Sequence, residues 1–120
     1  MNLVRGFVLV AALGAALGAT VAAATASPAE SRHDKDELLT LYLLTVAAER
    51  CGFPLTARQA DRIDRETKSL AEKLKLRPRE NDAVYSEADI TFERQGPAAC
   101  DRSGSFAKGF RKTLQRLTGP

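Results

Sequence analysis

The fold is decided by residues 34–51, DKDELLTLYLLTVAAERC. Asp34 and Glu37 have the spacing of a capping box, in which a side-chain oxygen accepts hydrogen bonds from free backbone N–H groups at a helix start. Gly52 and Pro54 follow, a pair typical of a helix end. The stretch therefore predicts a helix that begins at Asp34 and ends near Cys51. Its apolar residues leave almost no polar side: Leu38, Leu39, Leu41, Tyr42, Leu43, Leu44, Val46 and Ala47. Such a helix is either wrapped by its neighbours or exposes an apolar side.

Three further helices are predicted. The first opens on a second capping box, Thr56 with Gln59, and runs to about Leu76, before Pro78. Another is expected from Asp82 to about Gln95, ended by the Gly-Pro pair at 96–97. The last starts between Asp101 and Ser105 and runs to Leu117. No stretch alternates apolar and polar residues as a half-buried strand does. The sequence thus predicts an all-α fold, a small bundle of about four helices, with the 34–51 helix in the middle.

The N-terminal part has the pattern of a signal peptide. Residues 6–29 carry no charged side chain and follow the basic Arg5. Ala24-Thr25-Ala26 has the small residues of a signal-peptide cleavage site. The alternative is an uncleaved membrane anchor, because about 20 apolar residues can cross a bilayer. We expect cleavage, since Ala and Gly make up much of the stretch. The predicted organisation is a signal peptide at 1–26, a flexible lead-in at 27–33 and a single all-α domain at 34–120.

Cys51 and Cys100 are the two cysteines of the chain, and both lie after the predicted cleavage site. An even number of cysteines in an exported chain indicates a disulfide. The chain-entropy model gives such a bridge about 4 kcal/mol of stabilisation for a loop of roughly 50 residues. Catalysis by these thiols is disfavoured, because no C-x-x-C motif is present. We expect the protein to be periplasmic or secreted, with no transmembrane segment after cleavage.

Charge is concentrated at the C-terminus. Residues 102–120 carry five basic and no acidic side chains. Four of them fall on one side of the last predicted helix and form a candidate binding face: Lys108, Arg111, Lys112 and Arg116. Such a cationic amphipathic helix is typical of attraction to anionic lipid, polymer or an acidic protein surface. The alternative is a solvated face whose charge is partly balanced by the acidic 82–95 helix.

The 34–51 helix supplies a second candidate surface. Three short helices can leave part of it uncovered, so Leu39, Leu43 and Leu44 are a candidate apolar interface. They could hold an unknown protein partner or a second copy of the chain as a homodimer. Complete burial within one molecule is the alternative, and we favour it.

Residues suited to catalysis are few. His33, the single histidine, lies beside Asp34, Asp36 and Glu37, but no second nitrogen or thiolate ligand is available for a tetrahedral metal site. We predict no catalytic residues, no metal and no cofactor, since no nucleotide-binding glycine loop occurs. Nucleic acid is not an expected partner, because no aromatic residues interleave with the basic ones. The predicted function is protein–protein binding by an exported helical protein. The alternative is an envelope-surface binder that engages anionic lipid or polymer; an enzyme would need a cofactor or a partner-completed site.

Overall fold

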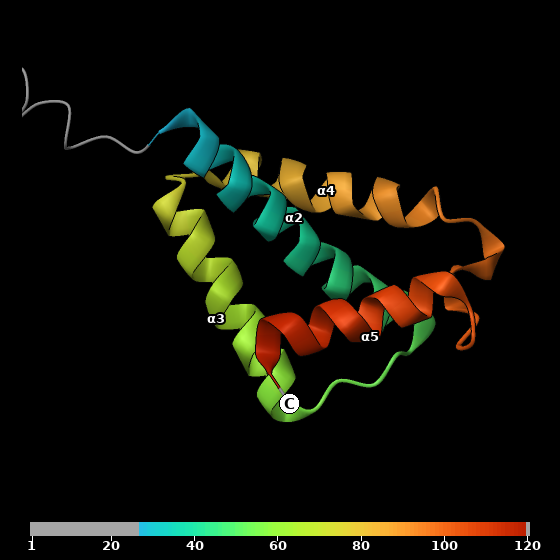
Figure 1. Ribbon diagram of the computed structural model, residues 1–120. Helices are drawn as coiled ribbons and strands as arrows, with labels where there is room; N and C mark the ends of the chain where they lie inside the picture. Colours follow the sequence, from blue (N-terminus) through green and yellow to red (C-terminus); the bar gives the residue numbers. More distant parts are fainter. Residues whose placement is uncertain (1–26, 120) are drawn as a thin grey trace, which may run out of the picture. The chain divides into compact units, whose positions relative to one another are not determined.

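The computed structural model describes residues 27–119. The predicted signal peptide, residues 1–26, lies outside the described residues. The chain divides into two units, residues 1–30 and 31–120, and the second holds nearly all of the described structure. Within residues 27–119 every regular element is helical, which confirms the all-α prediction (Figure 1). The elements are α2 (Pro28–Cys51), α3 (Ala57–Lys73), α4 (Pro78–Glu93), the short 3-10 helix η1 (Pro97–Cys100) and α5 (Ser105–Thr118).

Helix α2 begins six residues earlier than the sequence predicts. The Ser27 hydroxyl accepts a hydrogen bond from the Glu30 N–H at 3.1 Å, and Pro28 occupies the first helical position. Proline suits that position because its missing N–H would have no partner there. The prediction of a flexible lead-in at 27–33 is therefore wrong, as is the capping role of Asp34. Asp34 is an interior residue of α2 and is buried.

Helix α3 begins as predicted. The Thr56 hydroxyl accepts from the Gln59 N–H at 3.0 Å, and the Gln59 side chain accepts from the Thr56 N–H at 2.9 Å. These two bonds satisfy backbone donors that the helix itself leaves free. Lys75, just past the end of α3, adopts the left-handed conformation with φ of 55°. The chain therefore reverses within a few residues and enters α4.

Helix α4 begins at Pro78 rather than at Asp82. The Glu80 carboxylate accepts from the Arg77 backbone N–H at 2.9 Å and from the Arg77 side chain at 3.1 Å. Pro78 is thus the first residue of a helix, whereas the sequence prediction used it as the end of the preceding one. The predicted range for the last helix agrees with α5, which starts at Ser105.

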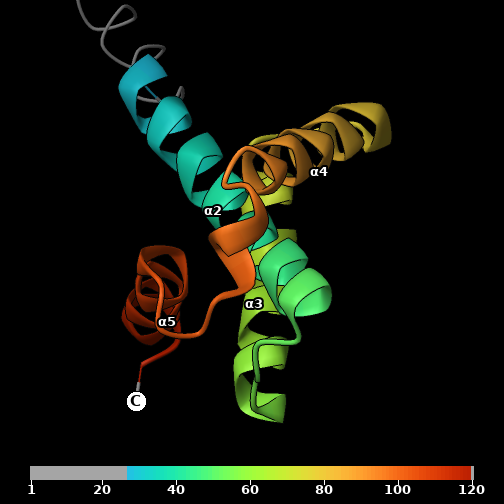
Figure 2. The same ribbon diagram turned by 90° about the vertical axis from the view of Figure 1, so that its right-hand side faces the viewer.

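Helix α2 supplies the largest share of the core. Leu38 and Ala47 are fully buried, and Leu41, Leu44 and Val46 are at most 4% exposed. The other elements each add one or more buried side chains: Phe53, Ile63, Val84, Ala88, Phe92, Ala99, Ala107, Phe110 and Leu114. Figures 1 and 2 show α4 and α5 on different sides of α2. The nearly all-apolar sequence of residues 38–48 of α2 is consistent with this position between its neighbours.

Aromatic pairs connect the helices at three places. Phe53, after α2, lies 5.0 Å from Phe110 of α5 between ring centroids. Phe92 near the end of α4 contacts Phe106 at the start of α5, at 5.7 Å. Tyr42 of α2 and Tyr85 of α4 meet edge to face at 5.4 Å. Each such pair adds about 0.5–1.5 kcal/mol beyond the area that it buries.

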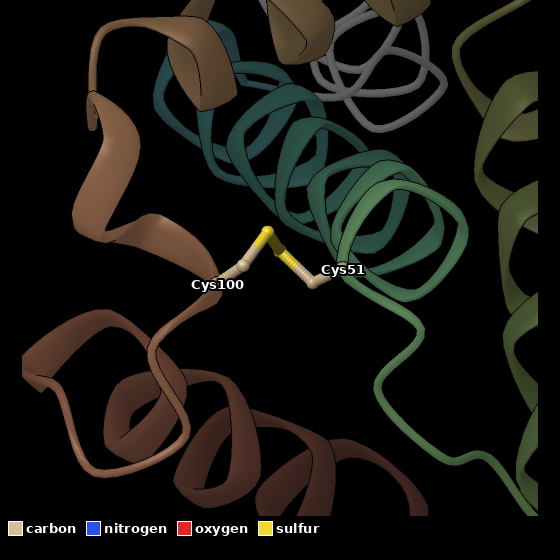
Figure 3. Close-up of a disulfide and its surroundings, with 2 residues drawn as sticks. All are labelled: Cys51 and Cys100. Carbon is tan, nitrogen blue, oxygen red and sulfur yellow. A yellow bond between two sulfur atoms is a disulfide. The ribbon is translucent and has the colours of Figure 1, made fainter.

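The predicted disulfide is present. Cys51, the last residue of α2, is bonded to Cys100, the last residue of η1, with Cα atoms 5.0 Å apart (Figure 3). The bridge therefore links the end of the central helix to the segment that enters α5. Among residues 27–119 no helix is long and apolar enough to cross a membrane.

Candidate binding surface

The four predicted residues of the basic face are all exposed on α5. Arg116 forms an ion pair with Glu37 of α2 at 3.6 Å. Arg111 donates a hydrogen bond to the backbone oxygen of Arg102 at 3.1 Å. Lys108 and Lys112 form no ion pair with any described residue. Two full positive charges of the basic face are therefore available to a partner.

The acidic side chains of α4 do not balance the basic face. Asp89 lies 2.6 Å and Glu93 3.6 Å from the guanidinium of Arg50 on α2. The same guanidinium lies 5.9 Å from the centre of the Phe92 ring, within reach of a cation–π contact. These carboxylates thus serve the packing of α4 on α2. The proposed balance between α4 and the basic face of α5 has no ion pair to support it among the described residues.

A groove runs between α2 and α5, and we name it the α2–α5 groove. It encloses about 310 Å³. Two elements supply nearly all of its lining, which is mostly apolar: Thr40, Leu43 and Leu44 from α2, Ser105, Phe106, Gly109, Phe110 and Thr113 from α5, and Gln95 between α4 and η1. Its volume is at the lower end of the range of small-molecule pockets and suits one or two large apolar side chains.

Gly109 keeps this groove open. It lies in the interior of α5, where glycine costs a helix about 0.5–1 kcal/mol relative to alanine. A β-carbon placed on it would meet no atom within 4 Å. Neither the backbone conformation nor close packing requires a glycine here. What the missing side chain does provide is open space in the wall of the groove.

The α2–α5 groove contains two of the three predicted interface leucines and none of the four basic residues. Leu43 and Leu44 line the groove, although Leu44 is only 4% exposed and so contributes to its floor rather than to an outer surface. Leu39 is partly buried against the core and is not among the lining residues. Lys112, about one turn beyond Gly109 on α5, is exposed and is not among the lining residues of the groove. Lys108, directly before Gly109, is exposed and likewise lies outside the lining.

The residues weighed for chemistry remain apart. His33 is exposed on α2, while Asp34 forms an ion pair with Lys73 of α3 at 2.9 Å. Residues 27–119 contain no cluster of three or more His, Cys, Asp or Glu side chains that could hold a metal ion.

Sequence reasoning missed the contribution of two segments. It did not single out Gly109, whose signal was a glycine in the middle of an otherwise amphipathic helix. It also gave no role to Phe53 and Arg102, which lie two residues after Cys51 and Cys100 and which the disulfide brings to one end of the bundle.

Comparisons of the chain with protein-family models, with curated proteins and with solved structures found no match.

Proposed function

We propose that this protein acts outside the cytoplasm by binding a partner protein, whose acidic amphipathic segment docks in the α2–α5 groove. The observation that carries the proposal is the open apolar groove at Gly109. It is lined by the same helix that carries Lys108 and Lys112, which are exposed and form no ion pair with a described residue. An apolar side chain of the partner fills the groove, and its carboxylates face Lys108 and Lys112. The partner's chemistry is thus set by the charge of α5.

The apolar part of the groove accounts for affinity. Binding energy in protein interfaces is concentrated in a few apolar or aromatic anchors that fill pockets and exclude water. Leu43, Phe106 and Phe110 form such a pocket for one anchor. Fully burying a large apolar side chain contributes about 1.5–3 kcal/mol, so a single anchor gives a weak complex unless neighbouring contacts add to it.

The basic side chains of α5 account for the selection of an acidic partner over a basic one. Residues 102–119 contain no acidic side chain, so a basic partner meets repulsion along the whole of α5. An acidic segment is attracted and oriented by the same field.

The disulfide supports a site of action in an oxidising compartment, because such bonds persist in the periplasm and outside the cell and are rare in the cytosol. The signal-peptide pattern of residues 1–26 points to the same location. Intact-mass measurement of the native protein tests this point: we expect an N-terminus at Ser27 and two fewer hydrogens than the dithiol form. An untrimmed N-terminus or two free thiols would contradict it.

The binding proposal is tested by comparing the wild-type protein with Gly109→Leu and Lys112→Gln as baits in an envelope extract. A β-carbon at position 109 meets no neighbour within 4 Å, and the rest of a leucine side chain would occupy the groove. Circular dichroism checks that the variant keeps its fold. The matched charge control is Arg79→Gln, which removes an exposed positive charge on α4. We expect one acidic protein that wild type and Arg79→Gln retain and that Gly109→Leu loses. Its purified form should bind wild-type protein at least tenfold more tightly than Gly109→Leu in calorimetry, and equal binding would refute the proposal.

A second candidate function rests on the exposed basic face itself: attachment to anionic lipid or polymer. Vesicles with and without phosphatidylglycerol, titrated at low and high salt, separate it from the first. Attachment by charge alone requires the anionic lipid, disappears as added salt screens exposed charges, and is insensitive to Gly109→Leu. Docking of an apolar anchor persists at high salt and depends on the groove.

A further inference from the structure

A second pocket lies on the other side of Phe110, and we name it the loop–α5 pocket. It encloses about 320 Å³. Its walls come from the segment between α2 and α3, from the first turn of α3, from the segment before α5, and from α5 itself. The lining residues are Phe53, Pro54, Gln59, Arg102, Phe110, Arg111 and Leu114.

The floor of this pocket is apolar and rigid. Phe53 and Phe110 are 7% and 6% exposed, and their rings pack at 5.0 Å. Leu114, also buried, lies one turn beyond Phe110 on α5. Close packing of these side chains leaves them little freedom to fill the pocket themselves. The site therefore offers a preformed surface to an apolar body.

The polar side chains of the pocket offer hydrogen-bond donors to a ligand. Arg102 and Arg111 have no carboxylate partner among the described residues. Arg111 donates one hydrogen bond to the backbone carbonyl oxygen of Arg102 at 3.1 Å. The remaining guanidinium N–H groups are available to a ligand. Gln59 adds an amide N–H, because its side-chain oxygen already accepts from the Thr56 N–H. Guanidinium groups bind carboxylates through paired hydrogen bonds.

Two of the lining segments of the pocket adjoin the disulfide. Phe53 follows Cys51 by two residues, and Arg102 follows Cys100 by two residues. The bond thus fixes the aromatic wall relative to the arginine wall, and Figure 3 shows the two segments diverging from it. A ligand that contacts both walls meets a site whose spacing is set before it binds, which lowers the entropy cost of binding.

We infer that the loop–α5 pocket binds a small amphiphilic carboxylate, with its apolar body against Phe53 and Phe110 and its carboxylate between Arg102 and Arg111. The absence of any acidic side chain from the lining favours an anion over a cation. The size of the pocket favours a compact arylalkanoate or a short fatty acid over a polymer. This site is separate from the α2–α5 groove and does not depend on the function proposed for it.

The test uses 3-phenylpropionate as the probe and 3-phenylpropanamide as its neutral counterpart, with binding followed by nuclear magnetic resonance titration of the full-length mature protein. We expect saturable binding of the acid, with shifts centred on the residues of the pocket, and about tenfold weaker binding of the amide. Arg111→Gln and Arg102→Gln should each lower the affinity for the acid by about tenfold and leave the affinity for the amide unchanged. Arg111→Lys should recover part of the affinity, because it keeps the charge but loses the paired geometry.

Lys112→Gln is the matched control, because it removes one positive charge from the same helix outside the pocket. Gly109→Leu is the second control, since it blocks the α2–α5 groove and leaves the loop–α5 pocket free. Both should bind the acid as wild type does. The inference is overturned if no saturable binding occurs at millimolar probe, or if acid and amide bind with equal affinity. It is also overturned if Lys112→Gln lowers the affinity for the acid as much as Arg111→Gln does. Loss of binding in Gly109→Leu with retention in Arg111→Gln would place the site in the groove and would equally overturn it.

Discussion

The Nζ atom of Lys73 on α3 lies 2.9 Å from Oδ2 of Asp34 on α2, and Asp34 is the one buried charged residue among residues 27–119. The Asp34 side chain is 12% exposed, whereas that of Lys73 is 52% exposed. The pair therefore consists of a carboxylate inside the helix packing and an ammonium that reaches it from the surface. Removing the ammonium leaves the carboxylate without its counterion, which costs more than the loss of an exposed pair.

Lys73→Met should lower the free energy of unfolding by about 1–2 kcal/mol, because the shielded Asp34 carboxylate loses its partner. Lys68→Met is a closely matched control. Lys68 lies on the same helix and pairs with Asp64 at 3.0 Å, but those side chains are 71% and 64% exposed. Removing an exposed pair of this kind changes stability by at most about 0.5 kcal/mol. Urea unfolding of both variants checks the difference, and equal effects would show that burial of Asp34 has no energetic consequence.

The same ion pair explains why the start of α2 was misjudged from the sequence. Asp34 and Glu37 have the spacing of a capping box, but Asp34 is bound by a lysine 39 positions away, which no local pattern indicates. A better local signal was present, because Ser27, Pro28 and Glu30 form the sequence of a capped helix start. Their position directly after the expected cleavage site led to their interpretation as a lead-in.

Other local signals were sufficient. The Thr56–Gln59 box and the glycine after Cys51 mark helix ends through bonds within a few residues, and the structure shows both. The disulfide followed from the count of two cysteines. The two pockets could not be predicted in this way, because each is formed by segments far apart in the chain. The basic face was visible in the sequence, whereas its relation to Leu43 and Gly109 depends on how α5 packs on α2.

Cys51→Ser combined with Cys100→Ser should lower the melting temperature by roughly 10 °C or more. The bridge spans 49 positions, and the chain-entropy model assigns about 4 kcal/mol to a closed loop of that length. Calorimetry of the variant, of the wild-type protein and of the wild-type protein under reductant checks this. The reduced wild-type protein should have the same melting temperature as the variant. A variant that melts with the oxidised protein would show that the bridge adds no stability.

Gly109→Ala should raise the free energy of unfolding by about 0.5–1 kcal/mol. The new methyl group meets no neighbour, and alanine is a better residue than glycine inside a helix. Gly96→Ala is the opposite case, because Gly96 has a φ of 78°, which alanine adopts only with strain. That variant should lose about 1 kcal/mol or more. Denaturant unfolding measures both, and a destabilised Gly109→Ala would mean that position 109 is not open as described.

The Asp101 carboxylate closes a turn that includes Arg102, one of the residues that line the loop–α5 pocket. One Asp101 carboxylate oxygen accepts from the Ser103 hydroxyl at 2.9 Å and from the Ser103 N–H at 3.0 Å. The side-chain bond first, and the backbone bond second, lower the pKa of Asp101 below its ordinary value of 3.8. Because the folded state favours the charged form, this contribution to stability is present above pH 3.8 and is lost as the pH falls through the lowered pKa.

Nuclear magnetic resonance titration of the carboxyl carbon should therefore give Asp101 a midpoint below 3.8. Ser103→Ala removes the larger of the two causes and should raise the pKa of Asp101 toward its ordinary value. Glu80 is an internal reference, because its pKa is lowered by Arg77 at the start of α4, so Ser103→Ala should leave its titration unchanged. A midpoint for Asp101 that Ser103→Ala does not move would mean that the turn does not hold the carboxylate in its charged form.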